Sequence, residues 1–406
     1  MMAFEGIFII LYTAFSFHVI MFAIEVVLSL VILLDLLLEI VTGSDYFRQE
    51  AKKFMNYIAV TYASAHFFLT ATTVIALTFF PDFLILVGQV LFYPLGFIIA
   101  VLIIRLVAIA YFWYGWDRLP KRLHFAVGII FVLAGLIWVW LDSVLLGFMN
   151  YSKGLISVNP LKVNHGQLFL NPTSFPLFLL LVFGAIATTC GFLIFYYGRR
   201  IISRKEIVMP DSSYRYRLFQ YYNYIGFSSA LLFAGSLIWY LSSLKKYAIY
   251  KYHNWMGSIF GLSTSNVDLS WFFIGFLLVV LVLVVNWSII VYRVYNCEYH
   301  DELITDNNKW QFLVIGPLLV VIFEMLILLN FISQSPYFIL SPFRDQVTGM
   351  SADLAVNPYA DIIDMYTLSI FGFGPLLIAF CVLLYYLFTG RIGGDFTFDG
   401  KTAAEL

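Results

Sequence analysis

The stretch YGWDRLPKRLH, residues 114–124, is a short charged turn between two long apolar runs. Both runs exceed the about 20 helical residues that cross the roughly 30 Å hydrocarbon core of a bilayer. A segment inside a bilayer must satisfy its own backbone hydrogen bonds, so both runs are expected to be helices. The turn therefore predicts a loop that joins two transmembrane helices. It also serves as the reference point from which positions in the neighbouring helices are counted.

The composition indicates lipid as the solvent. Hydrophobic residues make up 62% of the chain, charged residues only 12%, and the net charge is −1. Such a chain cannot present a water-compatible surface around one core, so we expect a multi-pass protein of the cell membrane. No basic tail suggests nucleic acid. Phosphate-binding loops, metalloprotease helices, nucleophile elbows and cysteine clusters are absent from the sequence, so catalysis of the soluble-enzyme type is not expected.

The fold class predicted is an all-α bundle of about nine transmembrane helices in one membrane domain, residues 1–406. The first run is too long for a cleaved signal peptide and lacks a basic leader, so it counts as a retained span. The predicted spans are 6–41, 54–80, 84–113, 124–148, 175–197, 218–243, 270–292, 311–333 and 363–389.

Most lysines and arginines fall in alternate loops, which places those loops in the cytoplasm. The N-terminus is then outside and the C-terminus inside, as an odd number of spans requires. The long loops 149–174, 244–269 and 334–362 are expected on the outside, where Asn150 begins a triplet that fits a glycosylation acceptor.

Ionisable residues at membrane depth are costly and are the first candidates for function. His18 either ligates haem iron or hydrogen-bonds a neighbouring helix. Glu25 is neutral, faces the bundle, or lies on a proton path. Arg105 is permanently charged and needs a carboxylate, a haem propionate or a route to the interface, with Glu25 and Glu324 as candidate partners.

His66 in the second span could share a haem iron with His18. Counted along ideal helices from the intervening turn, however, the two histidines differ in depth by about 9 Å. Asp35 and Glu39 are expected to be solvated at the inner interface, and Asp142 to be structural.

The turn formed by Gly115, Trp116, Asp117, Arg118 and Leu119 resembles the turn after the third helix in subunit I of cytochrome bd quinol oxidases. The likeness extends to Phe17-His18, to the basic entry of the second helix at 48–54, and to Leu170-Asn171-Pro172. It covers about residues 10–200, so residues 201–406 are interpreted as a diverged half.

The resemblance implies a haem ligand at His18, because His18 falls on the family's histidine in helix one. Other family positions carry residues that cannot bind iron. The two helix-three glutamates fall on Phe97 and Arg105, and the low-spin haem's histidine falls on Leu180. Its methionine falls within Phe272–Gly275. The loop 244–269 has no glutamate for the quinol site, and the Gly-Arg-Gln-Pro-Trp signature is missing.

These losses favour a subunit-I paralogue, similar to the second subunit of some archaeal oxidases, in a heterodimer with a haem-bearing chain. It would be non-catalytic or weakly haem-binding, with His18 alone open to haem, the low-spin haem absent and no quinone bound. Two alternatives are a diverged subunit that itself transfers electrons in the respiratory chain, and a secondary transporter using Glu25, Arg105 and Glu324.

Overall fold

The structure, a computed structural model, describes residues 2–158, 161–202, 212–262, 267–296 and 309–334. Within these residues, eight helices are long and apolar enough to cross a membrane, which confirms the all-α class. The predicted span at 363–389 lies outside the described residues. The elements, in chain order, are α1 (Met2–Thr42), α2 (Asp45–Phe79), α3 (Pro81–Val90), α4 (Phe92–Tyr114), α5 (Lys121–Asn150), β1 (Leu155–Val158), β2 (Leu161–Val163), α6 (His165–Phe169), α7 (Ser174–Ile202), α8 (Ser212–Tyr247), α9 (Ile249–Met256), a 3-10 turn (Ser258–Phe260), α10 (Ser270–Asn296) and α12 (Lys309–Ile332).

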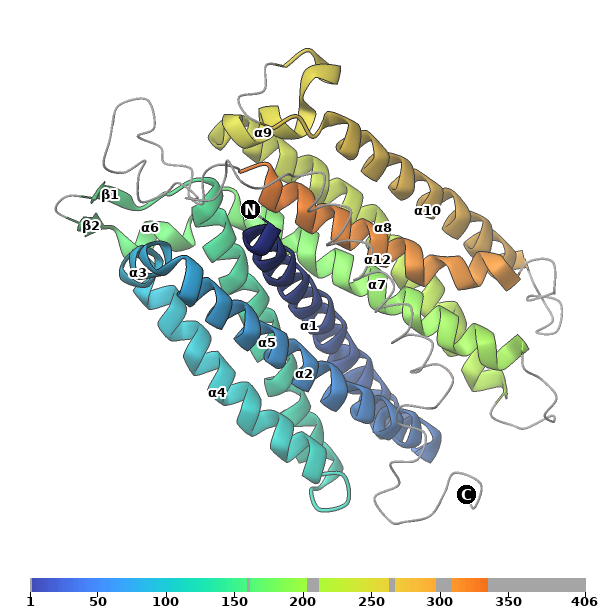
Figure 1. The fold of residues 1–406 in the computed structure, drawn as a ribbon. Helices are drawn as coiled ribbons and strands as arrows, with labels where there is room; N and C mark the ends of the chain where they lie inside the picture. Colours follow the sequence, from blue (N-terminus) through green and yellow to red (C-terminus); the bar gives the residue numbers. More distant parts are fainter. Residues whose placement is uncertain (1, 159–160, 203–211, 263–266, 297–308, 335–406) are drawn as a thin grey trace.

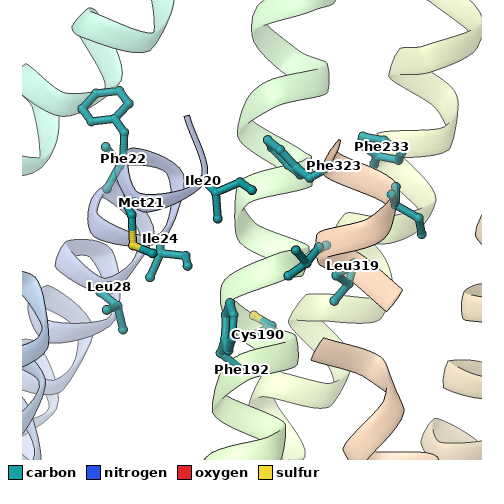
Figure 2. Close-up of a cluster of buried hydrophobic side chains, with 14 of the residues drawn as sticks. Ile20, Met21, Phe22, Ile24, Leu28, Cys190, Phe192, Phe233, Leu319 and Phe323 are labelled. Atoms are coloured by element: carbon teal, nitrogen blue, oxygen red, sulfur yellow. The ribbon is translucent and has the colours of Figure 1, made fainter. Parts of the chain in front are cut away.

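Helix α1 is the centre of the bundle. It lies between α2, α4 and α5 on one side and α7, α8, α10 and α12 on the other (Figure 1), and it contacts α2, α5, α7 and α12. A helix surrounded in this way has to be apolar on nearly every face, as the sequence of α1 is. Figure 2 shows part of this core, built from Ile20, Met21, Phe22, Ile24 and Leu28 of α1, Cys190 and Phe192 of α7, Phe233 of α8, and Leu319 and Phe323 of α12.

The outer helices expose apolar side chains. Phe67 on α2 is 68% exposed, Ile103 on α4 is 57% exposed, and Leu281 on α10 is 57% exposed. Contiguous surfaces of this kind are not compatible with water. They are the surfaces that meet lipid or another membrane chain.

The third predicted span, 84–113, is two helices rather than one. α3 ends at Val90 and α4 begins at Phe92. Pro94 lies in the first turn of α4, where a missing backbone N–H costs no helical hydrogen bond. The proline therefore lies at the start of a new helix.

The two ends of the bundle differ. One end, which we call the hairpin end, carries the antiparallel strands β1 and β2, α6 and α9 (Figure 1). The other, the turn end, carries residues 115–120 between α4 and α5. At the hairpin end, Asn171 Oδ1 accepts from Thr173 N at 3.0 Å, and Asn171 Nδ2 donates to Tyr151 O at 2.6 Å. These bonds fix the entry into α7. The orientation with the hairpin end outside stays a prediction.

Close packing of α8 against α7 and α10 depends on Gly226. A Cβ at this position would lie 2.6 Å from Cη2 of Trp287 and 2.7 Å from Cβ of Cys190. Gly226→Ala should therefore lower the free energy of unfolding by about 1–3 kcal/mol, measured by thermal unfolding in detergent. Gly235→Ala, on the same helix with nothing within 4 Å, is the control and should be neutral or slightly stabilising. Equal effects of the two substitutions would contradict this packing.

Candidate functional site

A fully buried ion pair joins α1 to α4. Arg105 Nη2 donates to Glu25 Oε1 at 2.5 Å and to Oε2 at 2.6 Å, and both side chains are 0% exposed. Of the two carboxylates expected as partners for Arg105, Glu25 is therefore the one in contact. Glu324 is also buried, on α12.

Four aromatic rings surround the guanidinium of Arg105. Its central carbon lies 4.9 Å from the centroid of Phe22, 5.1 Å from Phe131, 5.6 Å from Trp138 and 5.7 Å from Tyr62. Arg105 Nε and Nη1 have no hydrogen-bond partner among the described residues. The negative faces of the rings supply the stabilisation that hydrogen bonds do not.

His18 lies about two helix turns before Glu25 on α1 and contacts α2. It donates from Nδ1 to the carbonyl oxygen of Ala65 at 2.9 Å. A carbonyl can only accept, so Nδ1 carries the proton and the lone pair of Nε2 is left for another partner. A histidine held in this way has the arrangement that commonly orients an imidazole toward a metal.

His66 has the same tautomer. It donates from Nδ1 to Tyr62 O at 2.8 Å, and its buried Nε2 has no partner among the described residues. Its ring meets Trp138 edge to face at 5.6 Å. The expected depth difference of about 9 Å from His18 is wrong, because His18 bonds to Ala65, the residue directly before His66. The bond to Ala65 brings the imidazole of His18 beside the residue that directly precedes His66 on α2.

A cavity of about 80 Å³ lies beside His18, between α1, α5, α7, α8 and α12. This is room for more than one water molecule. Its polar lining consists of His18, Asp142, Tyr240 and Asn330, and the remaining lining residues are apolar. The oriented imidazole of His18 is the kind of nitrogen donor that haem iron takes, but a space of about 80 Å³ would have to widen before it could hold a haem.

The other family positions do not fit haem. Phe97 lies on the outer face of α4 and is 53% exposed, whereas Leu180 and Phe273 are buried. The space between α7, α8, α10 and α12 is about 10 Å³ and is lined by apolar residues, glycine and Thr188. No imidazole or thioether lines it. Among the described residues, no three His, Cys, Asp or Glu side chains could jointly hold a metal ion.

The turn at 115–119 is anchored by the basic entry of α2. Arg48 donates to Trp116 O and lies 3.7 Å from Asp117, and Lys52 lies 3.3 Å from Asp117. Trp116 is buried against His124, with ring centroids 4.6 Å apart. The turn and the entry of α2, which share the family resemblance, thus form one structural unit.

The carboxylates Asp35 and Glu39, at the turn end of α1, are buried, which corrects the expectation that they are solvated. Glu39 is 1% exposed and pairs with Arg48 at 3.3 Å and Lys121 at 2.7 Å. Asp35 is 0% exposed, and neither of its oxygens has a hydrogen-bond partner among the described residues. Contacts between α1 and α2 cover both positions.

A buried polar network at the hairpin end was missed from the sequence. Lys251 on α9 is 0% exposed and donates from Nζ to Asn150 Oδ1 and to Asn330 Oδ1, each at 2.7 Å. Tyr240 bridges the same two asparagines, accepting from Asn150 at 2.9 Å and donating to Asn330 at 2.7 Å. Burial lowers the pKa of Lys251 well below its usual range. Asn150 is inside this network and is 1% exposed, so it is not a glycosylation acceptor here.

Comparisons with known proteins agree with this architecture. The sequence profile described as Cytochrome bd terminal oxidase subunit I matches residues 9–236, more than half of the 406-residue chain. The fold is similar to that of the bd oxidase from Geobacillus thermodenitrificans, with a TM-score of 0.74 over 95% of this chain and 98% of that chain. The identity is 15%, so this likeness concerns the fold alone. No curated protein matches the sequence.

Eight helices in the described part of the chain are long and apolar enough to cross a membrane, and two of them, α1 and α4, are joined by a fully buried ion pair. These features define a multi-pass protein of the plasma membrane. The chain belongs to the cytochrome bd terminal oxidase subunit I family. This membership argues against the secondary-transporter interpretation.

Breaking the buried ion pair should be strongly destabilising. Arg105→Met leaves the Glu25 carboxylate alone in an apolar environment and should cost about 3–5 kcal/mol of unfolding free energy. The double variant Glu25→Leu/Arg105→Met removes both charges and should recover most of that loss.

The control is Lys121→Met, which breaks the ion pair with Glu39 through a side chain that is 51% exposed. A pair at the surface typically contributes about 0–1 kcal/mol. Thermal or denaturant unfolding in detergent measures all three variants. If Arg105→Met lowered the free energy of unfolding by no more than Lys121→Met does, Arg105 would not be needed to stabilise the buried Glu25 carboxylate.

Proposed function

We propose that this chain is a non-catalytic or weakly haem-binding membrane subunit of a bd-type terminal oxidase. In this role it packs against a haem-bearing subunit-I-like chain in a heterodimer. The complex as a whole oxidises quinol and reduces oxygen, and the partner carries the electrons.

The observation that carries the proposal is the ion pair of Arg105. The family resemblance puts a haem-serving glutamate at this position, and the chain has a permanent cation there instead. The cation is already neutralised by Glu25 at 2.5 Å and enclosed by four rings. A site that once served cationic iron is thus occupied by the protein's own positive charge.

The remaining ligand positions support the same role. Leu180 and Phe273 offer no atom that binds low-spin haem iron, and both are packed in the core. In the loop 244–269, Lys251 is turned inward onto Asn150 and Asn330, so its ammonium group does not face an external quinol. The proposal includes the absence of the low-spin haem and of a bound quinone from this chain.

The partner is expected on the exposed apolar faces of the outer helices, which include α2. A pseudo-symmetric arrangement would place related surfaces of the two chains against each other. Lipid covers the parts of these faces that the partner does not contact.

Purification of the tagged full chain from native membranes in mild detergent tests the proposal. We expect a second chain of the same family at a one-to-one ratio, with the haem in the complex following that chain. After the two are separated, this chain alone should give little haem by the pyridine haemochrome assay and no quinol-dependent oxygen uptake. Full haem content and turnover by this chain alone would overturn the accessory role.

A second candidate is a diverged subunit that itself holds haem, and His18 favours it. Its Nδ1–H is fixed by Ala65, and its ring lines the cavity. Bound there, a haem would supply one-electron chemistry, while His18 would orient it through Nε2.

Titration of the purified chain with haem b measures this capacity. We expect weak binding, with a dissociation constant at least tenfold higher for His18→Leu. His66→Leu is the control and should bind as the unmodified chain does, because His66 does not line the cavity. Equal loss in both variants would mean that iron lies between the two histidines, and no loss in either would remove His18 as a ligand.

A further inference from the structure

A surface groove at the turn end is independent of the haem question. It is lined by Ala110, Tyr111, Tyr114, Gly115, Arg118 and Leu119, and its volume is about 290 Å³. These residues form the last turn of α4 and the turn that follows it. The groove is therefore at the level where the apolar surface of α4 gives way to charged residues.

Arg118 is a cation without a carboxylate in the described part of the chain. Its basic neighbours are already paired: Arg48 and Lys121 with Glu39, and Lys52 with Asp117. The local acidic groups are thus in use, and the Arg118 guanidinium lines an open groove. A guanidinium with free donors recognises phosphate by paired hydrogen bonds.

The aromatic residues of the groove place it at the membrane interface. Tyr111 and Tyr114 are each 61% exposed. Tyrosines in this position lie at the headgroup level of a bilayer, with the ring toward the hydrocarbon and the hydroxyl toward water. Their hydroxyl groups can donate to the same anion that Arg118 attracts.

An apolar track leads from the groove along α4. Ile103 is 57% exposed and Val107 is 50% exposed, and with Tyr111 they follow one another at the four-residue spacing of a helix face. From Ile103 to Tyr114 the track extends about 16 Å at 1.5 Å per residue. An acyl chain can pack along such a track, whereas a free phosphate ion has no apolar part that could contact it.

We propose that this groove binds an anionic phospholipid, with its phosphate on Arg118 and the two tyrosines and one acyl chain along α4. Phospholipid is preferred over a protein partner because the groove joins an unpaired cation to an apolar track about 16 Å long. It also agrees with the orientation expected from the sequence, since anionic lipids attract basic groups at the cytoplasmic surface. The proposal holds whether or not the chain binds haem.

The test measures lipid binding to the full chain, with any subunits that stay bound, by native mass spectrometry. The probes are dioleoyl phosphatidylglycerol, dioleoyl phosphatidylcholine and soluble glycerol 3-phosphate. We expect at least one phosphatidylglycerol to bind more tightly than phosphatidylcholine, and glycerol 3-phosphate to bind weakly. Arg118→Gln should weaken phosphatidylglycerol binding about tenfold, the loss expected for one charge-assisted contact.

The matched control is Arg122→Gln, which removes the same charge from the first turn of α5. This substitution leaves the residues that line the groove unchanged. It should change phosphatidylglycerol binding less than twofold. Equal effects of the two substitutions, no preference for phosphatidylglycerol, or equally tight glycerol 3-phosphate would overturn the proposal. So would a photoreactive analogue in place of Tyr111 that crosslinks to a polypeptide instead of to lipid. Haem content is read separately, so failure here leaves the proposed oxidase role untouched.

Discussion

The buried contact between Glu25 and Arg105 is the constraint on which the N-terminal part of the bundle depends. Either charge alone at membrane depth would be very costly, so α1 and α4 must keep the register that joins them at 2.5 Å. The rings around the guanidinium come from α1, α2 and α5. One electrostatic requirement thus constrains the packing of α1, α2, α4 and α5.

Features that depend on a single segment could be predicted from the sequence. The spans follow from length and hydropathy, because a bilayer leaves a long apolar segment no alternative to a helix. The need of Arg105 for a carboxylate followed from its charge and depth, and Glu25 was one of two candidates. The turn at Gly115–Leu119 gave the family, which the sequence profile confirms over residues 9–236.

Features that depend on how distant segments meet could not be predicted. The nearness of His18 to His66 depends on how α1 and α2 pack against each other, which counting along ideal helices does not give. Asp35 is charged and near a helix end, as solvated residues are, yet neighbouring helices cover it. Lys251 gave no signal at all, since its partners Asn150 and Asn330 lie 101 and 79 residues away.

The network of Lys251 has a consequence for how the protein matures. Tyr240 and Asn330 belong both to that network and to the wall of the cavity beside His18, so Lys251 of α9 holds two residues of the cavity wall in place. A bulky prosthetic group could not enter from that side of the finished fold without unlocking four hydrogen-bonded side chains. Loading would have to come early in biogenesis, before α9 and α12 complete this network, or sideways from the lipid phase.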